Sequence, residues 1–368
     1  MIFKRVNTTK SKLRRSGFSI LILVFIFNIS HTSKSAKNNA IEGELKITFL
    51  ISEADKKIEV LAGGKPFTTF QWPDNISKPV LYPIYASTGT EITRGFPVNP
   101  KTGERADHPH QIGMWLTYGN VNGNDFWGNG SKGLGTKNAN GGVIKHLRTE
   151  KIEGGKGRGS FVSHESWCDT TGTELLKELS EYHFFAKGAI RIIDRITTLT
   201  ALEKEVMMPD TKEGMFGIRV ARQLEHPTKG DVELYQADRT IRKEKDTLNM
   251  GITGNYQSSE GISGEAVWGT RACWMKLDGS IGKEKMSVVI CDHSQNPNYP
   301  TYWHARGYGL LSANPLGVKD FTKGKEILDF SIGSGQSVTF RYRVLIYSGD
   351  DFTGDVIENY YNEFETKF

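Results

Sequence analysis

The sequence predicts a mainly β protein, a large two-sheet antiparallel β-sandwich with a helix at its C-terminus. Short segments with a period of two residues, rich in β-branched and aromatic side chains, recur along the chain. Gly, Asn and Pro turns separate these segments, whereas helical spacing of apolar residues is convincing only near the end. No internal repeat or clear linker divides the 368 residues, so we expect one β-sandwich domain over residues 36–368.

The first strands are expected to form a meander. Residues 46–52, 57–62 and 66–72 read as three short strands joined by tight turns. Residues 78–86 continue the pattern but contain two prolines, which cannot donate to a strand ladder. We therefore expect an edge strand or a loop-like path there.

The middle of the chain predicts a long loop and then long strands. Residues 120–142 are dense in Gly and Asn, which indicates either a flexible excursion or a rim over a site. Three strands are expected within residues 159–202, although residues 173–185 have helical propensity, because residues 190–197 show a strand period rich in β-branched side chains. Further strands are expected at residues 210–222, 232–237, 265–277, 286–291 and 337–347.

The last segment predicts a helix. Asp350 or Thr353 is placed to cap it. Five apolar side chains then follow on one face at helical spacing: Val356, Ile357, Tyr360, Tyr361 and Phe364. This pattern is typical of an amphipathic helix with one buried side.

Residues 1–35 have the layout of a secretory signal peptide. Basic residues come first, an apolar stretch follows over residues 18–27, and small and polar residues come last. The apolar stretch is too short to span a bilayer comfortably, which disfavours the alternative of an uncleaved anchor. We expect a periplasmic or secreted protein without stable membrane insertion after cleavage.

The positive net charge belongs mostly to this leader. Residues 1–35 hold seven Lys and Arg and no acid, so their removal changes the formal charge from +5 to −2. A nucleic-acid partner is therefore not expected.

The cysteines predict no disulfide framework. Cys168, Cys273 and Cys291 lie far apart, allow at most one intramolecular disulfide and lack the spacing of a zinc site. We expect buried, unpaired thiols.

Two loop-rich stretches carry a high density of His, Arg, Asp and Trp. The first covers residues 94–127, and the second covers residues 292–306, directly after an apolar strand. Polar side chains on Pro- and Gly-rich loops are better explained by a site than by packing. We expect the two stretches to meet in space; the alternative is ordinary surface loops with chance histidines.

Several short motifs within and between these stretches form a specific set. They are Arg94 with Phe96-Pro97, Asp107-His108-Pro109-His110 with Gly113 and Trp115, Asn122-Gly123 with Asp125-Phe126-Trp127, Lys212-Glu213-Gly214, Trp268-Gly269 with Arg271-Ala272, Asp292-His293 with Asn296-Pro297, and Trp303-His304. From about residue 45 onward, this set resembles the methane oxygenase PmoA-like family, a bacterial family of unknown function. The resemblance implies a fold and a site rather than a reaction.

The aromatic content of the motifs favours a sugar ligand. A strand-rich chain of this size with an aromatic, His-lined concave face is similar to the galactose mutarotase-like supersandwich of sugar mutarotases and several polysaccharide lyases and hydrolases. Indole faces suit the apolar faces of sugar rings, with core packing as the alternative. Four tryptophans are predicted to bind substrate: Trp115, Trp127, Trp268 and Trp303.

Arginines in the same segments favour an acidic sugar. The guanidinium fork matches a carboxylate or sulfate, although ordinary ion pairing is the alternative. The four candidates are Arg94, Arg219, Arg271 and Arg306.

Histidines supply the expected acid–base chemistry. His110 and His304 are the predicted catalytic residues, with Glu213 as the carboxylate that orients a histidine or acts as the opposite base. His108, Asp292 and His293 are predicted to contact substrate. A carboxylate pair is an unspecific further possibility, with Glu165, Glu178, Glu213 and Asp292 as candidates.

A metal ion is the main rival use of the histidines. The i, i+2 spacing of His108 and His110 places both imidazoles on one side of an extended backbone, and Asp107 or His304 would complete a mononuclear site. The principal expectation is no cofactor, because the chain has no glycine-rich phosphate motif.

These observations favour an exported carbohydrate-active enzyme that cleaves a glycosidic bond or epimerises a sugar by His/Glu acid–base chemistry. Two alternatives remain open. The chain is either a non-catalytic carbohydrate-binding protein that uses the same aromatic and Arg groove, or a metal-dependent enzyme.

Overall fold

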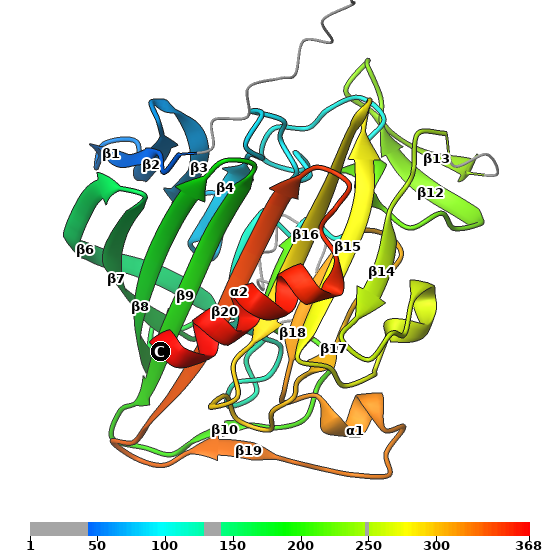
Figure 1. The fold of residues 1–368 in the computed structure, drawn as a ribbon. Helices are drawn as coiled ribbons and strands as arrows, with labels where there is room; N and C mark the ends of the chain where they lie inside the picture. The colour runs from blue at the N-terminus through cyan, green and yellow to red at the C-terminus, as the bar shows by residue number, and fades with distance from the viewer. Residues whose placement is uncertain (1–42, 129–140, 247–249) are drawn as a thin grey trace, which may run out of the picture. The chain divides into compact units, whose positions relative to one another are not determined.

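The computed structural model describes residues 43–128, 141–246 and 250–368 and confirms the mainly β, antiparallel prediction (Figure 1). Sixteen strands of the described residues form one sheet, which divides into two halves. The predicted signal peptide, residues 1–35, and the centre of the predicted loop at 120–142 lie outside the described residues. The assignment of residues 36–368 to one domain stays a prediction.

The first half contains the long strands of the middle and the C-terminal part of the chain. In spatial order they are β14 (Asn255–Ser258), β15 (Trp274–Ile281), β16 (Glu284–Asp292), β20 (Ser337–Ser348), β9 (Ile190–Ala201), β8 (Glu174–Lys187), β7 (Arg158–Cys168) and β6 (Val143–Lys156). The strands β7, β8 and β9 are the three predicted within residues 159–202.

The second half begins with the predicted meander. In spatial order its strands are β1 (Lys46–Ser52), β2 (Lys57–Ala62), β3 (Lys65–Gln71), β4 (Val80–Ile84), β5 (Met114–Tyr118), β11 (Gly214–Arg219), β18 (Leu310–Asn314) and β17 (Tyr302–Trp303). Pairing of β1 with β6 joins the two halves, with Lys46 opposite Lys156 and Ile47 opposite Gly155.

The remaining elements are short, apart from one helix. Two small antiparallel ribbons pair β10 (Val206–Met208) with β19 (Phe330–Ile332) and β12 (Gly230–Tyr235) with β13 (Ile241–Asp246). The helices are η1 (Arg222–Leu224), η2 (Gly264–Val267), α1 (Val318–Phe321) and α2 (Gly354–Lys367). No helix of the described residues is long and apolar enough to cross a membrane.

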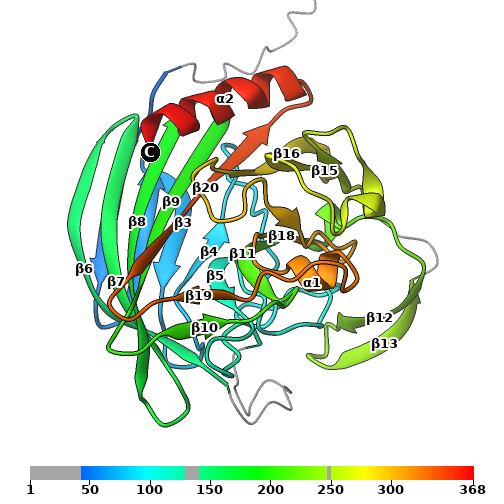
Figure 2. The same ribbon diagram turned by 90° about the horizontal axis from the view of Figure 1, so that it is seen from below.

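The core lies between the two halves, whose strands face each other in Figure 2. Phe67 of β3 meets Phe184 of β8 edge to face, with ring centroids 5.8 Å apart. Phe216 of β11 stacks on Tyr342 of β20 at 4.7 Å. Because side chains from both halves interdigitate in this way, the folded sheet packs as a two-layer sandwich.

Helix α2 lies across the first half on the side away from this core, as Figure 1 shows. It buries Ile357, Tyr361 and Phe364 at helical spacing, and a second apolar cluster joins them to β9, β16 and β20. The amphipathic helix is therefore confirmed, but Val356 of the predicted apolar face is exposed. All three cysteines are free thiols, and Cys273 is only partly buried.

Three strand predictions are wrong in detail. Strand β4 lies between β3 and β5 rather than at an edge, and it tolerates Pro83 because its described pairing with β5 is a single residue pair, Leu81 with Met114. The segment at 210–222 is a strand only from Gly214 to Arg219, and the segment at 265–277 starts as η2.

The long strand β6 was not predicted, because its polar, Gly-rich sequence lacks a clear period.

A polar cluster is buried within the core. Glu165 of β7 lies directly opposite Glu178 of β8. Glu178 accepts hydrogen bonds from Arg195 Nη2 and Trp167 Nε1, both at 2.7 Å. Glu165 accepts one from Ser163, while its Oε2 has no partner among the described residues. Burial, and then the charge of Glu178, raise the pKa of Glu165 well above its ordinary value.

The substitution Glu165→Gln is expected to change how stability depends on pH. A carboxyl with a raised pKa keeps its proton in the folded state after the unfolded chain has released it, so wild-type stability falls as pH rises above about 4.5. Glutamine does not titrate. The free energy of unfolding of the variant relative to wild type should therefore rise between pH 5 and pH 8, by up to about 1.4 kcal/mol per pH unit.

Urea unfolding at four pH values measures this difference. Glu181→Gln, a change on the opposite face of the neighbouring strand β8, serves as the control. A difference between Glu165→Gln and wild type that stays constant from pH 5 to pH 8 would show that Glu165 is ionised in the folded protein.

Candidate functional site

The site residues lie on the face of β5, β11 and β18 that is turned away from the core. Side chains alternate between the two faces along β5, so Met114 and Leu116 lie in the core and Trp115 lies on the opposite face. There Trp115 belongs to a separate apolar cluster. Gly217 of β11 lies opposite Trp115 in the strand register. A Cβ at Gly217 would lie only 3.0 Å from Trp115 Cζ2, so a glycine there makes room for the indole.

Arg94 fixes the loop that presents the histidines. Its Nη1 donates to the carbonyl oxygens of Asp107 (2.7 Å) and Arg105 (3.3 Å). Its Nη2 donates to the carbonyl oxygens of His108 (2.9 Å) and Gln111 (3.0 Å). Arg94 is fully buried, so it holds the loop together and is not open to a substrate.

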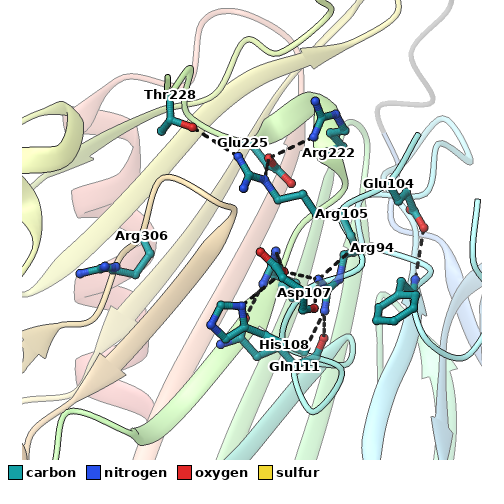
Figure 3. A network of polar contacts seen from close by, with 12 residues as sticks. Arg94, Glu104, Arg105, Asp107, His108, Gln111, Arg222, Glu225, Thr228 and Arg306 are labelled. Carbon is teal, nitrogen blue, oxygen red and sulfur yellow. Dashed lines mark hydrogen bonds and ion pairs between the residues drawn. The ribbon is translucent and has the colours of Figure 1, made fainter. Parts of the chain in front are cut away.

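Asp107 is the counter-ion of two buried arginines (Figure 3). Its Oδ1 accepts from Arg94 Nη1 at 2.8 Å and from Arg219 Nη2 at 2.6 Å, and it lies 3.3 Å from His108 Nδ1. Burial raises the pKa of Asp107, but the Arg219 charge, the nearby His108 imidazole and the Arg94 charge outweigh it and hold the pKa far below its ordinary value. Arg219 also donates to Gln111 Oε1 at 2.5 Å.

Tyr308 connects this network to the second loop stretch. The guanidinium of Arg219 lies 4.6 Å from the centroid of the Tyr308 ring. The imidazole of His108 stacks on that ring, with centroids 4.7 Å apart and planes at 14°. Tyr308 was not among the predicted site residues. Its position two residues after Arg306, just beyond the motif-rich stretch, is the signal that could have identified it.

His304 has a fixed tautomer. Its Nδ1 donates to the carbonyl oxygen of Lys212 at 2.7 Å, which leaves Nε2 as the proton acceptor. Burial lowers its pKa to about 4, although the charge of Glu213 acts in the opposite direction. His304 is therefore neutral at pH 7. Its ring lies parallel to that of Trp127, with centroids 6.2 Å apart, which confirms that the two loop stretches meet.

His110 lies beside a buried lysine. Burial, and then the charges of Lys78 and His108, lower the pKa of His110 to about 2, and its Nδ1 has no hydrogen-bond partner among the described residues. Burial also lowers the pKa of Lys78 to about 7. Lys78 Nζ donates to the Trp127 carbonyl oxygen at 3.3 Å and lies 5.2 Å from the Trp115 ring centroid. No sequence pattern singled out Lys78.

The structure does not gather the histidines into a metal-ligand set. The rings of His108 and His110 lie edge to face, with centroids 5.7 Å apart. Across the described ranges, no group of three or more His, Cys, Asp or Glu side chains could hold a metal ion. The use of His108, His110 and His304, with or without Asp107, as metal ligands stays a prediction.

Three of the four predicted substrate-binding tryptophans pack inside the protein. Trp115, Trp127 and Trp303 are buried, and Trp303 Nε1 donates to the Ala272 carbonyl oxygen at 3.0 Å. We assign these three indoles to packing, because a fully covered ring cannot receive a sugar face. Trp268 is only partly buried and remains a candidate.

Three more predicted substrate-binding residues, Arg271, Asp292 and His293, bind other parts of the protein in or beside the 292–301 segment. Arg271 donates to the carbonyl oxygens of Pro300 (2.8 Å) and Asn298 (2.7 Å), so it secures the loop. Asp292 is buried, which raises its pKa to about 7, and it accepts from the Thr301 backbone N–H at 2.8 Å. His293 is fully buried and lies edge to face with Phe364 of helix α2, with ring centroids 5.1 Å apart.

An open cleft of about 360 Å³ lies next to Tyr308. Its walls combine an aromatic side chain from each of two loops with charged and hydroxyl groups. They are formed by Arg105, Thr228, Glu265, Trp268, Ala305, Arg306, Gly307 and Tyr308. This size and composition suit a small polar ligand.

Solved structures similar to this chain are distant. The galactosidase domain of the α-galactosidase–sucrose kinase AgaSK is 9% identical over 82% of this chain and 42% of its own, with a TM-score of 0.39. The Slr1438 protein from Synechocystis sp. PCC 6803 is 10% identical over 84% and 98%, with a TM-score of 0.28. The α-galactosidase from Lactobacillus brevis is 10% identical over 83% and 39%, with a TM-score of 0.26.

This chain spans less than half the length of the two galactosidases. At these TM-scores, none of the three similarities tells what this chain binds or catalyses. No curated protein matches the chain.

A family model described as a family of unknown function, DUF6807, matches residues 57–362. This match overturns the resemblance to the methane oxygenase PmoA-like family. The individual motifs behind that resemblance were short Pro, Gly, His and Trp clusters, and several of them hold loops together, as Arg94, Arg271 and Asp292 do here.

Proposed function

The chain belongs to the DUF6807 family of unknown function, and we propose that it is an exported carbohydrate-active enzyme that acts by proton transfer at His304. The reaction is glycosidic bond cleavage or sugar epimerisation. Export rests on the signal-peptide layout of residues 1–35.

The geometry of His304 carries this proposal. The hydrogen bond from Nδ1 to the Lys212 carbonyl oxygen, 2.7 Å long, holds the ring and presents Nε2 as a base. A pKa of about 4 keeps the imidazole neutral at neutral pH, so Nε2 is able to take a proton from a sugar hydroxyl, a sugar carbon or a water molecule.

Glu213 supports the charge that forms on His304. Its negative charge raises the pKa of His304 against the effect of burial, so it stabilises the imidazolium that proton uptake produces. The Glu213 side chain is 35% exposed and lies 3.0 Å from Lys212 Nζ. The charge of the Glu213 carboxylate therefore acts on His304, and the carboxylate is also accessible from solvent, as a second acid–base group must be.

The adjacent cleft supports a sugar as the substrate. Trp268 and Tyr308 offer aromatic surface, while Arg306, Glu265 and Thr228 offer donors and acceptors for hydroxyl groups. A volume of about 360 Å³ is within the range of small-ligand sites.

A non-catalytic carbohydrate-binding protein is the second candidate. One observation favours it: His304 is only 2% exposed, so little of the proposed base faces solvent. Such a protein would bind sugar in the same cleft and release it unchanged.

A turnover screen of the purified protein against neutral and uronic-acid oligosaccharides, with and without chelator, tests the proposal. We expect product formation that the chelator does not reduce. Activity abolished by the chelator would move the chemistry to a metal ion, and binding without product would favour the binding protein.

The pH dependence of turnover should follow His304. Protonation of Nε2 removes the base, so kcat/KM is expected to fall as pH drops below about 4 and to stay level from pH 5 to pH 7. An acid limb near the ordinary histidine value of about 6.5 would show that another group is the base.

A further inference from the structure

Three of the four arginines predicted to bind an acidic sugar are occupied by the protein itself. Arg94 and Arg219 are fully buried and share the carboxylate of Asp107. Arg271 donates three hydrogen bonds to the segment Asn298–Pro300. Arg94 and Arg219 are therefore closed to a ligand, and Arg271 is engaged mainly in holding this segment.

Arg306 differs from the other three. It is exposed, it lines the cleft, and its guanidinium lies 5.7 Å from the ring centroid of Trp268. Within residues 43–128, 141–246 and 250–368 the guanidinium has no hydrogen bond or ion pair, and in Figure 3 no dashed line reaches it. Stacking near an indole restricts the side chain while leaving its hydrogen-bond donors free.

A second arginine of the cleft keeps one nitrogen free. Arg105 Nε donates to Glu225 Oε2 at 2.6 Å, and Nη2 donates to Thr228 Oγ1 at 3.3 Å. Its Nη1 has no hydrogen-bond partner among the described residues. The buried ion pair with Glu225 therefore holds Arg105 in place at the cleft wall.

Arg105 belongs to a network of charged side chains. Its described members are Arg94, Arg105, Arg219 and Arg222 with Glu104, Asp107 and Glu225. Burial, and then the charge of Arg219, lower the pKa of Arg94 to about 9. The positive charges of neighbouring arginines therefore act on one another, and an anion in the cleft would reduce this repulsion.

We propose that the cleft binds the carboxylate of an acidic sugar unit, with Arg306 as the main partner and Arg105 Nη1 as the second. This inference rests on the proposed function and names its substrate class. Glu265, the one exposed acid of the cleft wall, accepts hydrogen bonds from the hydroxyl groups of the same sugar unit. Arg306 thus binds the carboxylate of the sugar ring and Glu265 binds its hydroxyl groups, which fixes the orientation of the ring in the cleft.

Calorimetric binding measurements test the inference. The probes are a galacturonate disaccharide and a glucuronate disaccharide, each compared with its carboxyl-reduced neutral counterpart. We expect Arg306→Gln to weaken binding of the acidic disaccharide about 10- to 100-fold and to change binding of the neutral one less than about 3-fold, because a charge-assisted hydrogen bond is lost only from the acidic ligand.

Two further variants complete the design. Glu265→Gln should weaken binding of the acidic and the neutral disaccharide by similar factors. Arg148→Gln changes a distant, exposed arginine of β6 and should leave both unchanged. Equal melting temperatures for all variants and wild type show that folding is intact.

The outcomes separate the inference from the proposed function. Tight binding of neutral disaccharides with no gain for the acidic ones, or an equal loss of both in Arg306→Gln, overturns the inference and leaves the sugar site intact. If neither acidic nor neutral disaccharides bind, both proposals fail.

Discussion

The substitution His304→Asn is expected to lower kcat by about 10²- to 10⁴-fold, the usual contribution of a positioned general base. Asparagine places an amide N–H near the position of Nδ1, so the hydrogen bond to the Lys212 carbonyl oxygen is preserved. The proton acceptor Nε2 is lost. Affinity for the saccharide should change little, because the cleft walls of Trp268, Arg306 and Tyr308 supply most of its expected contacts.

Steady-state kinetics and calorimetric binding of the same variant check this expectation. The matched control is His164→Asn on β7 of the other half, where His164 Nε2 lies 3.1 Å from Glu150 Oε1 and 3.2 Å from Arg148 Nη2. Wild-type kcat in His304→Asn would remove His304 from the chemistry. Loss of binding together with turnover would indicate a role in holding the substrate.

The substitution Asp107→Asn is expected to destabilise the protein by about 3–5 kcal/mol. Arg94 and Arg219 are fully buried and share this single carboxylate, at 2.8 Å and 2.6 Å. Without its charge, two buried guanidinium groups lose their counter-ion, and the loop that carries His108 and His110 loses its anchor. Chemical denaturation with urea measures the change in the free energy of unfolding.

Asp74→Asn is the control for this prediction. Asp74 forms an ion pair with Lys56, but its side chain is 89% exposed, so the loss should be within about 1 kcal/mol. A similarly small effect for Asp107→Asn would mean that solvent or a rearranged neighbour neutralises the two arginines, and that the loop is held by the Arg94 hydrogen bonds to backbone carbonyls alone.

The fold class was predictable because it depends on local pattern. Residues 57–62 alternate between buried and partly buried side chains, as their sequence period predicts. Residues 190–197 are buried on both faces, because helix α2 covers the outer face, and they are identified by their β-branched side chains instead. Strand β6 lacks such a period, and its place in the sheet is decided by its neighbours β1 and β7.

The candidate site was predictable in part. The expected meeting of the two loop stretches is confirmed by the contact between the rings of Trp127 and His304. The sequence could not predict that the arginines bind other parts of the protein. Arg94, for example, donates its hydrogen bonds to backbone carbonyl oxygens, which every residue possesses.

Residue roles in the 292–306 segment depend on how the loop turns. Asp292 ends β16 and is buried, and the next residue, His293, packs against Phe364 of α2. His304, 11 residues after His293, instead donates from Nδ1 to the carbonyl oxygen of Lys212, which precedes β11. Nothing in the local sequence distinguishes the two histidines, since both follow an aromatic or acidic neighbour in a Pro-rich loop.

The most direct test of a sugar-processing site at His304 is a crystal structure of the His304→Asn variant with the oligosaccharide that the turnover screen identifies. We predict a sugar ring in the cleft of Trp268, Arg306 and Tyr308, with a reacting atom next to the position of His304 Nε2. A sugar bound elsewhere, for example in the groove of about 600 Å³ formed by Lys156, Arg158 and Lys367, would contradict this account.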